Sequence, residues 1–357
     1  MTATYQPLAG ITAQEVSTDR LRHYVLTAGP ETGTPVIFIH GNASSSIFWE
    51  ETMLTLPDGY RAIAPDMRGY GFTEAQPIDA TRGFGDWVDD FRALIEALGL
   101  QRYHLVGHSL GGTFVFNWLA EQPSGVLSAT VICPGSPYGY GGCQGLDGAL
   151  TWPDGAGSGG GVVNPDFARL MDEGYRGTEH DASPLNVMRQ FYFKPPFIPA
   201  REEALLTSLL LQQTGPEAYP GDLTPSQNWP MAAPGKLGPI NMVAPNYRGD
   251  SVERFVAAEP KPPVLWLRGS DDLIVSDNSL FEVGTLGKMG AIPGYPGEEV
   301  YPPQPMVAQT RHVLDQYQQQ GGNYLEVVME GTGHTPYIEQ PTVFDEHFHA
   351  FLAGKGG

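Results

Sequence analysis

The fold is decided by residues 103–112, which read YHLVGHSLGG. The first four residues predict a buried strand, and the spacing of the apolar residues over 110–121 predicts a helix. Between them Gly107, Ser109 and Gly111 fit the pattern G-x-S-x-G, in which glycines allow a tight, strained turn. Such a turn presents the serine at the carboxyl end of a strand, beside the free N–H groups of a helix N-terminus. An ordinary glycine-rich turn is the alternative interpretation.

Strand and helix patterns alternate on both sides of this stretch. Further runs of apolar, β-branched residues predict strands at 36–39, 61–66, 129–133, 264–267 and 324–329. Helical spacing predicts one helix over 86–98, with Asp86 as its N-cap and Gly99 as its stop, and a closing helix over 343–352. Nearly continuous apolar strands belong to a parallel sheet whose two faces are covered. We therefore expect an α/β fold with a mostly parallel central sheet and helices on both faces.

A long loop-rich region interrupts this alternation. Residues 135–262 are rich in glycine and proline and contain short helical pieces such as 201–211. We expect them to form an inserted, mainly helical and loop cap on a core made of residues 1–134 and 263–357. A second stretch rich in glycine and proline, 284–304, predicts a surface loop near the mouth of the site.

A serine nucleophile needs a base, and the base needs an acid that orients it. His334 follows the last predicted strand on a loop bounded by glycine, where it can reach a site at the strand ends. A surface histidine is the alternative. Two aspartates, Asp271 and Asp272, follow the strand at 264–267. We predict Asp272 as the acid because it stands three residues after the strand-ending glycine and precedes an apolar turn. Asp271 is the alternative, and its other possible role is to cap that turn.

The chain order Ser109, Asp272, His334 on such a sheet resembles the α/β-hydrolase superfamily. Two further stretches resemble motifs of that family: residues 40–42, which read HGN, and residues 66–71, which read DMRGYG. The resemblance implies the α/β-hydrolase fold with an inserted cap, and a catalytic triad made of these three residues.

An oxyanion hole also follows from the resemblance. It implies that the backbone N–H groups of Leu110 and Asn42 hold the developing negative charge, with Ala43 as the alternative to Asn42. His40 is expected to support its loop rather than to react. A serine mechanism of this kind uses neither a metal ion nor an organic cofactor, so we expect none.

The resemblance predicts a serine hydrolase that cleaves a carboxylic ester or lactone through an acyl-enzyme. Aromatic residues are frequent in the cap, which favours a small hydrophobic or aromatic substrate. Phe48, Trp49 and Tyr138 are the predicted substrate-binding residues.

Three alternatives use the same triad or the same fold. An aminopeptidase or amidase similar to proline iminopeptidases would hold a substrate amine with cap carboxylates, and the candidates are Glu202, Glu203 and Glu217. A C–C bond hydrolase needs the same triad, and a non-catalytic ligand receptor needs only the fold. Epoxide hydrolase and haloalkane dehalogenase activities are disfavoured, because family members with these activities have an aspartate where this chain has Ser109.

The charge of the chain limits its partners. Its 357 residues include 40 acidic and 20 basic ones, a net charge of −20. Such a charge repels nucleic acid and anionic membrane surfaces, so we expect a small-molecule substrate and neither of those partners. No run approaches the roughly 20 apolar residues of a membrane helix, and the first residues lack the basic and apolar parts of a leader.

Two cysteines, Cys133 and Cys143, make no disulfide framework. We therefore expect a reduced, cytoplasmic protein, with a single bridge between the two cysteines as the alternative. The sequence makes no prediction of the oligomeric state.

Overall fold

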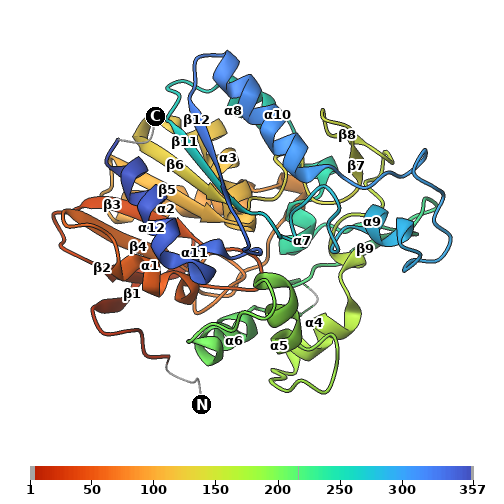
Figure 1. Ribbon diagram of the computed structural model, residues 1–357, viewed down its shortest axis with the longest axis horizontal. Coiled ribbons are helices and arrows are strands. Elements are labelled where there is room, and N and C mark those ends of the chain that lie inside the picture. Colours follow the sequence, from red (N-terminus) through yellow and green to blue (C-terminus); the bar gives the residue numbers. More distant parts are fainter. Residues whose placement is uncertain (1–4, 216, 355–357) are drawn as a thin grey trace.

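The computed structural model describes residues 5–215 and 217–354, and an eight-stranded sheet forms the centre of this part of the chain (Figure 1). The strand order is β1-β2-β4-β3-β5-β6-β11-β12. The strands are Ile11–Ser17 (β1), Arg22–Ala28 (β2), Thr34–Ile39 (β3), Tyr60–Pro65 (β4), Tyr103–His108 (β5), Val126–Ile132 (β6), Val264–Gly269 (β11) and Tyr324–Met329 (β12). Strands β1, β2 and β4 pair antiparallel, and all neighbours from β4 to β12 pair parallel. The predicted strands and the mostly parallel sheet are confirmed.

Helices cover both faces of the sheet, as predicted. On one face lie α2 (Gly85–Ala97), α3 (Leu110–Glu121), α8 (Ser251–Ala257) and α10 (Met306–Gln319); on the other lie α1 (Glu50–Leu54) and α12 (Pro341–Leu352). Alternate side chains of one strand enter different cores. In β3, Ile37 and Ile39 join the first core, whereas Val36 and Phe38 join the second. This two-sided burial explains why the strands read as continuous apolar runs.

The cap region combines short helices with two small hairpins. It contains α4 (Pro165–Asp172), α5 (Pro184–Val187), a π-helical turn (Met188–Tyr192), α6 (Glu202–Leu210), α7 (Pro239–Met242), the hairpin β7 (Cys143–Gln144) with β8 (Ala149–Leu150), and the hairpin β9 (Leu223–Pro225) with β10 (Ala232–Pro234). Figure 1 shows α4, α5 and α6 grouped together, and they share a third hydrophobic cluster that also includes Phe48 of the core.

Some boundaries differ from the sequence predictions. Helix α8 lies within residues 135–262, but its Val252 and Phe255 belong to the first core, and Phe255 stacks on Tyr317 of α10 with ring centroids 4.6 Å apart. This last part of the expected cap therefore packs as part of the core. The predicted N-cap Asp86 is wrong: Phe84 is the N-cap of α2, and the Asp86 carboxylate accepts the backbone N–H of Asp79 instead.

The stretch 284–304 is only in part the surface loop that was predicted. It starts within α9 (Val283–Lys288), where the Glu282 carboxylate accepts two backbone N–H groups of the first turn. At its other end Tyr301 is buried, and its hydroxyl bonds to cap backbone atoms of Gly142 and Ala156. Both ends of this insertion are therefore fixed to the protein.

Two further predictions concern the whole chain. Cys133 and Cys143 are both buried and free, so the alternative of a bridge between them is not realised. None of the helices within residues 5–215 and 217–354 is both long enough and apolar enough to cross a bilayer. The predicted absence of a leader also concerns residues 1–4, which lie outside the described residues.

Candidate active site

Ser109 lies on a strained turn between β5 and α3. Its backbone angles are φ 53° and ψ −118°, a region that residues with a side chain rarely adopt. The turn needs its two glycines: a Cβ on Gly107 would lie 2.2 Å from the carbonyl oxygen of Gly111, and one on Gly111 would lie 2.4 Å from that of Ile39. The strand, the tight turn and the helix are the context in which a G-x-S-x-G serine acts as a nucleophile.

His334 and Asp272 meet at the same edge of the sheet. The Nδ1 atom of His334 lies 2.8 Å from Oδ2 of Asp272, and both side chains are buried. The other carboxylate oxygen of Asp272 accepts the backbone N–H groups of Ile274 and Val275 at 2.8 and 2.9 Å. These bonds fix the carboxylate, which in turn places the ring proton of His334 on Nδ1 and leaves Nε2 free to accept a proton.

The competing aspartate points elsewhere. Asp271 is exposed, accepts the Ser270 hydroxyl and forms an ion pair with Lys194 at 3.0 Å. Of the two adjacent aspartates, the structure therefore brings Asp272 and not Asp271 to His334. Asp272 also caps the turn that follows, the role that was considered for Asp271.

His108 connects the nucleophile turn to the base. Its Nε2–H donates to the backbone carbonyl of His334 at 2.8 Å, and the two rings lie 4.8 Å apart. Burial lowers the pKa of His108, so the ring stays neutral. This residue adjoins Ser109 in the chain and holds the loop of His334, a role that the sequence analysis did not find.

The two predicted oxyanion donors come from two different segments next to Ser109. The N–H of Leu110 is in the first turn of α3, where no preceding helical carbonyl can accept it. The loop of Asn42 follows β3, and a Cβ on Gly41 would lie only 3.0 Å from Cβ of Ser109. Ala43 is the weaker alternative, because its N–H donates to Oε1 of Gln212 at 3.2 Å.

His40 has the supporting role that was expected for it. Its Nδ1–H donates to the carbonyl of Gly41 at 2.8 Å, and its Nε2 accepts the N–H of Met67 at 3.0 Å. The bond accepted by Nε2 requires the neutral ring, and burial lowers the pKa of His40 to about 4.

The DMRGYG turn is structural as well. The Asp66 carboxylate accepts the backbone N–H groups of Ser46 and Phe72, and a Cβ on Gly71 would lie 2.0 Å from that carboxylate. Arg68 binds Asp90 through two hydrogen bonds of 2.6 and 2.8 Å. These bonds fix the turn, and its Tyr70 hydroxyl donates to Oδ1 of Asn42 at 2.9 Å.

The predicted substrate-binding residues lie in different surroundings. Phe48 is buried where the core meets the cap, with its ring 6.2 Å from that of Tyr192. Trp49 is fully buried in the second core and stacks on Tyr337 at 4.5 Å, so it is a core residue rather than part of a pocket wall. Tyr138 belongs to the first core and lies under the guanidinium of Arg248. The prediction is corrected for Trp49 and Tyr138, because packing already uses their rings.

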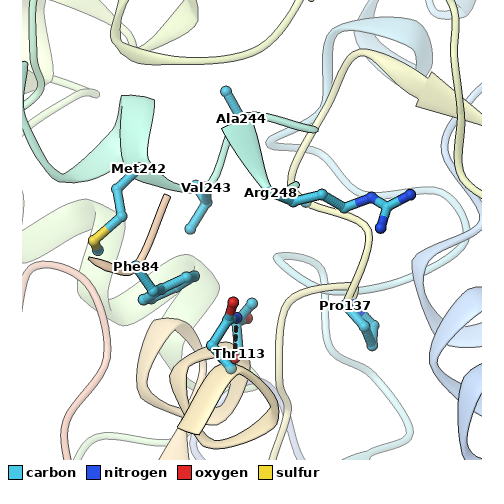
Figure 2. Close-up of a pocket in the computed structure, with 9 residues that line it drawn as sticks. Phe84, Thr113, Pro137, Met242, Val243, Ala244 and Arg248 are labelled. Atoms are coloured by element: carbon cyan, nitrogen blue, oxygen red, sulfur yellow. Dashed lines mark hydrogen bonds between the residues drawn. The ribbon is translucent and has the colours of Figure 1, made fainter. Parts of the chain in front are cut away.

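Two hollows of the molecule lie beside α3. Figure 2 shows the smaller one, between Thr113 of α3 and the cap residues Met242 and Val243. It holds about 10 Å³, room for one water molecule. The larger one, about 280 Å³, has a charged lining that includes Arg82 and Arg254. Ser109, Asp272 and His334 line neither of these two hollows.

One group of side chains has the composition of a metal site. Atoms of Cys133, Asp272 and His334 that could ligate a metal lie within 4.8 Å of one another, all buried. Burial and the nearby Asp272 carboxylate raise the pKa of the Cys133 thiol well above its usual value. A protonated thiol is a poor metal ligand, and Asp272 already binds His334, so the group fits a triad better than a metal centre.

The fold and this site define the class of the protein. A family model for the alpha/beta hydrolase fold matches residues 34–282, and the chain belongs to this family. The predicted superfamily is confirmed.

Particular relatives show which hydrolases the chain resembles. It is 32% identical over 112 residues to the serine hydrolase-like protein of Danio rerio, across 31% of this chain and 33% of that protein. It is 34% identical over 112 residues to epoxide hydrolase 2 of Siraitia grosvenorii, across 31% of this chain and 35% of that protein. It is 29% identical over 125 residues to carboxylesterase YbfK of Bacillus subtilis, across 34% of this chain and 41% of that protein. The matches span only about a third to two-fifths of the length of these relatives.

Solved structures agree on the architecture. The crystal structure of carboxylesterase CesB (YbfK) from Bacillus subtilis has a TM-score of 0.58 at 16% identity and covers 96% of this chain and 92% of its own. Esterase RhEst1 from Rhodococcus sp. ECU1013 has a TM-score of 0.58 at 20% identity, covering 97% and 100%. At these identities the similarity shows the fold alone.

Proposed function

We propose that this α/β hydrolase cleaves a carboxylic ester or lactone of a small hydrophobic or aromatic substrate through an acyl-enzyme. The observation that carries the proposal is the buried pair of His334 and Asp272, 2.8 Å apart, at the strand edge where Ser109 stands on its strained turn. A buried, oriented imidazole beside a serine elbow is suited to acyl transfer.

The proposed reaction has two halves. Oγ of Ser109 attacks the carbonyl carbon while Nε2 of His334 takes its proton, and Asp272 stabilises the resulting imidazolium. The N–H groups of Leu110 and Asn42 hold the oxyanion. The intermediate collapses when His334 returns the proton to the leaving alkoxide. Water then enters, loses a proton to His334 and attacks the acyl carbon. When the bond to Ser109 breaks, His334 returns this proton to Oγ of Ser109 and the acid is released.

The peptidase alternative has less support. Glu202 is bound by two hydrogen bonds to Arg189, at 2.6 and 2.7 Å, and Glu203 pairs with Arg176 at 2.7 Å. These carboxylates are already neutralised by arginines, so they are poor sites for a substrate amine. The C–C hydrolase alternative requires the same triad, and the chain is also 31% identical over 146 residues to the 2-hydroxymuconate semialdehyde hydrolase of Pseudomonas sp. (strain CF600). The receptor alternative has no observation of its own in favour of it.

Substitution of the nucleophile tests the proposal. We expect Ser109→Ala to lower kcat on p-nitrophenyl esters by at least about 1,000-fold while the fold is retained. Ser251→Ala, on α8, is the matched control and should keep full activity. Undiminished ester hydrolysis by Ser109→Ala would contradict the assignment. Hydrolysis of aminoacyl arylamides by the wild type, without turnover of esters or lactones, would favour the peptidase alternative.

A further inference from the structure

A short cap segment touches three of the four segments that carry the candidate site, all but the Ser109 turn. We define it as the clamp segment, residues 191–194, which begins in the last part of the π-helical turn Met188–Tyr192. Turns of this kind occur frequently at functional sites. Its four residues contact the loop of Asn42, the loop of His334 and the loop of Asp272.

The first contact is with the Asn42 loop. The hydroxyl of Tyr192 donates to the backbone carbonyls of Asn42 at 3.1 Å and of Ala43 at 3.3 Å. Burial raises the pKa of Tyr192 above its ordinary value, so the phenol remains a proton donor. This bond spans 150 residues of sequence and joins the cap to the core.

The second contact is with the loop of His334. The hydroxyl of Thr335 donates to the backbone carbonyl of Tyr192 at 2.6 Å. The Glu339 carboxylate accepts the N–H of Lys194 at 2.8 Å and the N–H of Gly333 at 2.7 Å. The residues on both sides of His334 are therefore tied to the clamp segment.

The third contact, with the loop of Asp272, is more exposed. The ring of Phe191 packs edge-on against Phe281 with centroids 5.0 Å apart, and Lys194 pairs with Asp271 at 3.0 Å. An exposed ion pair such as Lys194–Asp271 contributes less free energy to holding the segment than the buried hydrogen bonds of Tyr192.

The backbone on either side of Asn42 shows what the buried contacts achieve. The carbonyl of Gly41 accepts from His40 and from Ser44, and the carbonyl of Asn42 accepts from Tyr192. The N–H of Ala43 donates to Gln212, a second cap residue. Among the described contacts, the N–H of Asn42 is the one polar atom of these two peptide groups that has no protein partner, and it is the predicted oxyanion donor.

We infer that Tyr192 is a positioning residue for catalysis: its hydroxyl, supported by Gln212, holds the Asn42–Ala43 peptide so that the N–H of Asn42 points at the oxyanion. This inference rests on the proposed serine hydrolase function. In this view the cap does more than cover the substrate. Its attachment to the Asn42 loop is also required for stabilisation of the transition state. An oxyanion donor acts through its fixed orientation, so a loose peptide lowers kcat more than it raises KM.

Tyr192→Phe isolates the hydroxyl. Phenylalanine keeps the ring packing on Phe48 and the backbone bond to Thr335, and it loses only the bonds to Asn42 and Ala43. We expect kcat on a p-nitrophenyl ester to fall about 10- to 100-fold, with KM changed less than about threefold. The pH dependence of kcat/KM should keep its shape, because the bond between His334 and Asp272 is untouched.

Tyr247→Phe is the matched control, because the Tyr247 hydroxyl also donates to a backbone carbonyl, that of Gly235 at 2.9 Å, within the 135–262 region. Both variants should lower the urea midpoint of unfolding to a similar extent, whereas only Tyr192→Phe should lower kcat. Wild-type kcat in folded Tyr192→Phe, or an equal fall in both variants, would overturn the inference. If Tyr192→Phe does not fold, Tyr192→His is the second variant, because its ring keeps an N–H donor. It should be folded and have a kcat between zero and the wild-type value. An unfolded Tyr192→His would also overturn the inference.

Covalent labelling separates this inference from the proposed function. An organophosphonate ester that reacts with activated serines should label Ser109 of the wild type, and label Tyr192→Phe 10- to 100-fold more slowly. Equal labelling rates would refute the role of Tyr192 alone. A wild type that neither hydrolyses esters nor reacts with the phosphonate would refute the proposed function itself.

Discussion

The two halves of the proposed oxyanion hole are held by different parts of the molecule. The N–H of Leu110 lies in the first turn of α3, close after the core strand β5. The N–H of Asn42 lies on a loop whose core side is held by His40 and whose outer side is held by Tyr192 and Gln212 of the cap.

This difference separates what folding alone provides from what the cap adds. The nucleophile turn, the acid and the base are fixed by short segments at the ends of β5, β11 and β12. The second oxyanion donor needs in addition a segment 150 residues further along the chain. We call the segments of Ser109, Asp272 and His334 the core-built half. Substitutions there should abolish activity, whereas substitutions of the cap residues that hold the Asn42 loop should only reduce kcat.

The largest effect is expected in the core-built half, from Asp272→Asn. Asparagine keeps the shape of the side chain, but it has no negative charge to stabilise the imidazolium, and its NH₂ group favours the wrong tautomer of His334. We expect kcat to fall by about 1,000- to 10,000-fold with little change in the free energy of unfolding. Ester kinetics and urea denaturation measure the two quantities.

Asp271→Asn is the matched control for this variant. Asp271 is the adjacent residue, is exposed, and contacts Lys194 and Ser270 rather than His334. Its substitution should change kcat by less than about threefold. A larger loss in Asp271→Asn than in Asp272→Asn would reverse the assignment of the acid.

The core-built half was largely predictable from the sequence because its signals are local. The strand ending at Gly107 and the helix after Ser109 read directly from apolar spacing, and the two glycines are required by close backbone contacts. Even the choice between Asp271 and Asp272 could be argued from the residues that follow them. Loops at the ends of neighbouring parallel strands meet in space, so the proposed triad could be assembled from the sequence alone.

The cap side could not be predicted in the same way. Tyr192 and Gln212 reach the Asn42 loop across 150 and 169 residues, and no spacing or motif marks them among the other aromatic and polar residues of the cap. The same ambiguity explains the corrections for Trp49 and Tyr138. An aromatic residue has the same signature in a sequence whether its ring fills a core or lines a pocket, and only packing decides.

Acid should weaken the core side of the Asn42 loop. Burial lowers the pKa of both His40 and His104 to about 4, so each folded ring stays neutral at pH 5 while the unfolded ring takes up a proton below about pH 6.5. The unfolded state therefore binds more protons in this window, and stability is lost as the pH falls. Each histidine should contribute a loss of about 2 kcal/mol between pH 7 and pH 5. Asp66 acts in the opposite direction, because burial raises its pKa to about 6.

A variant isolates the contribution of one histidine. His104, which bonds to Ser128 in the core, can be replaced without touching the active-site loops. Between pH 7 and pH 5 the free energy of unfolding of His104→Gln should fall by about 2 kcal/mol less than that of the wild type. Urea unfolding at both pH values measures this difference. His347→Gln, on the exposed side of α12, is the control for removing an imidazole. If the pH dependence of His104→Gln equals that of the wild type, His104 is not buried in its neutral form.

The smallest of these effects is expected on the cap side, from Gln212→Met. Methionine fills a similar volume, but it leaves the buried N–H of Ala43 without its partner, which should cost about 1–3 kcal/mol of stability. The carbonyl of Gly69 loses one of two bonds and keeps the one from the backbone N–H of Gln213. The Asn42–Ala43 peptide is then held only at its carbonyl end by Tyr192, so it can turn partly away. We expect kcat to fall about tenfold, with a smaller change in KM.

Gln213→Met shows whether that loss comes from the peptide or from the attachment of the cap in general. The Gln213 amide also joins the cap to the core, through a bond of 2.8 Å to the carbonyl of Thr73, but it does not touch the Asn42 loop. It should lower the stability and leave kcat within about twofold of the wild type. If both variants slow the reaction equally, the cap acts by its overall attachment. If only Gln212→Met does, the cap controls catalysis through the Asn42–Ala43 peptide group, which adjoins the N–H of Asn42.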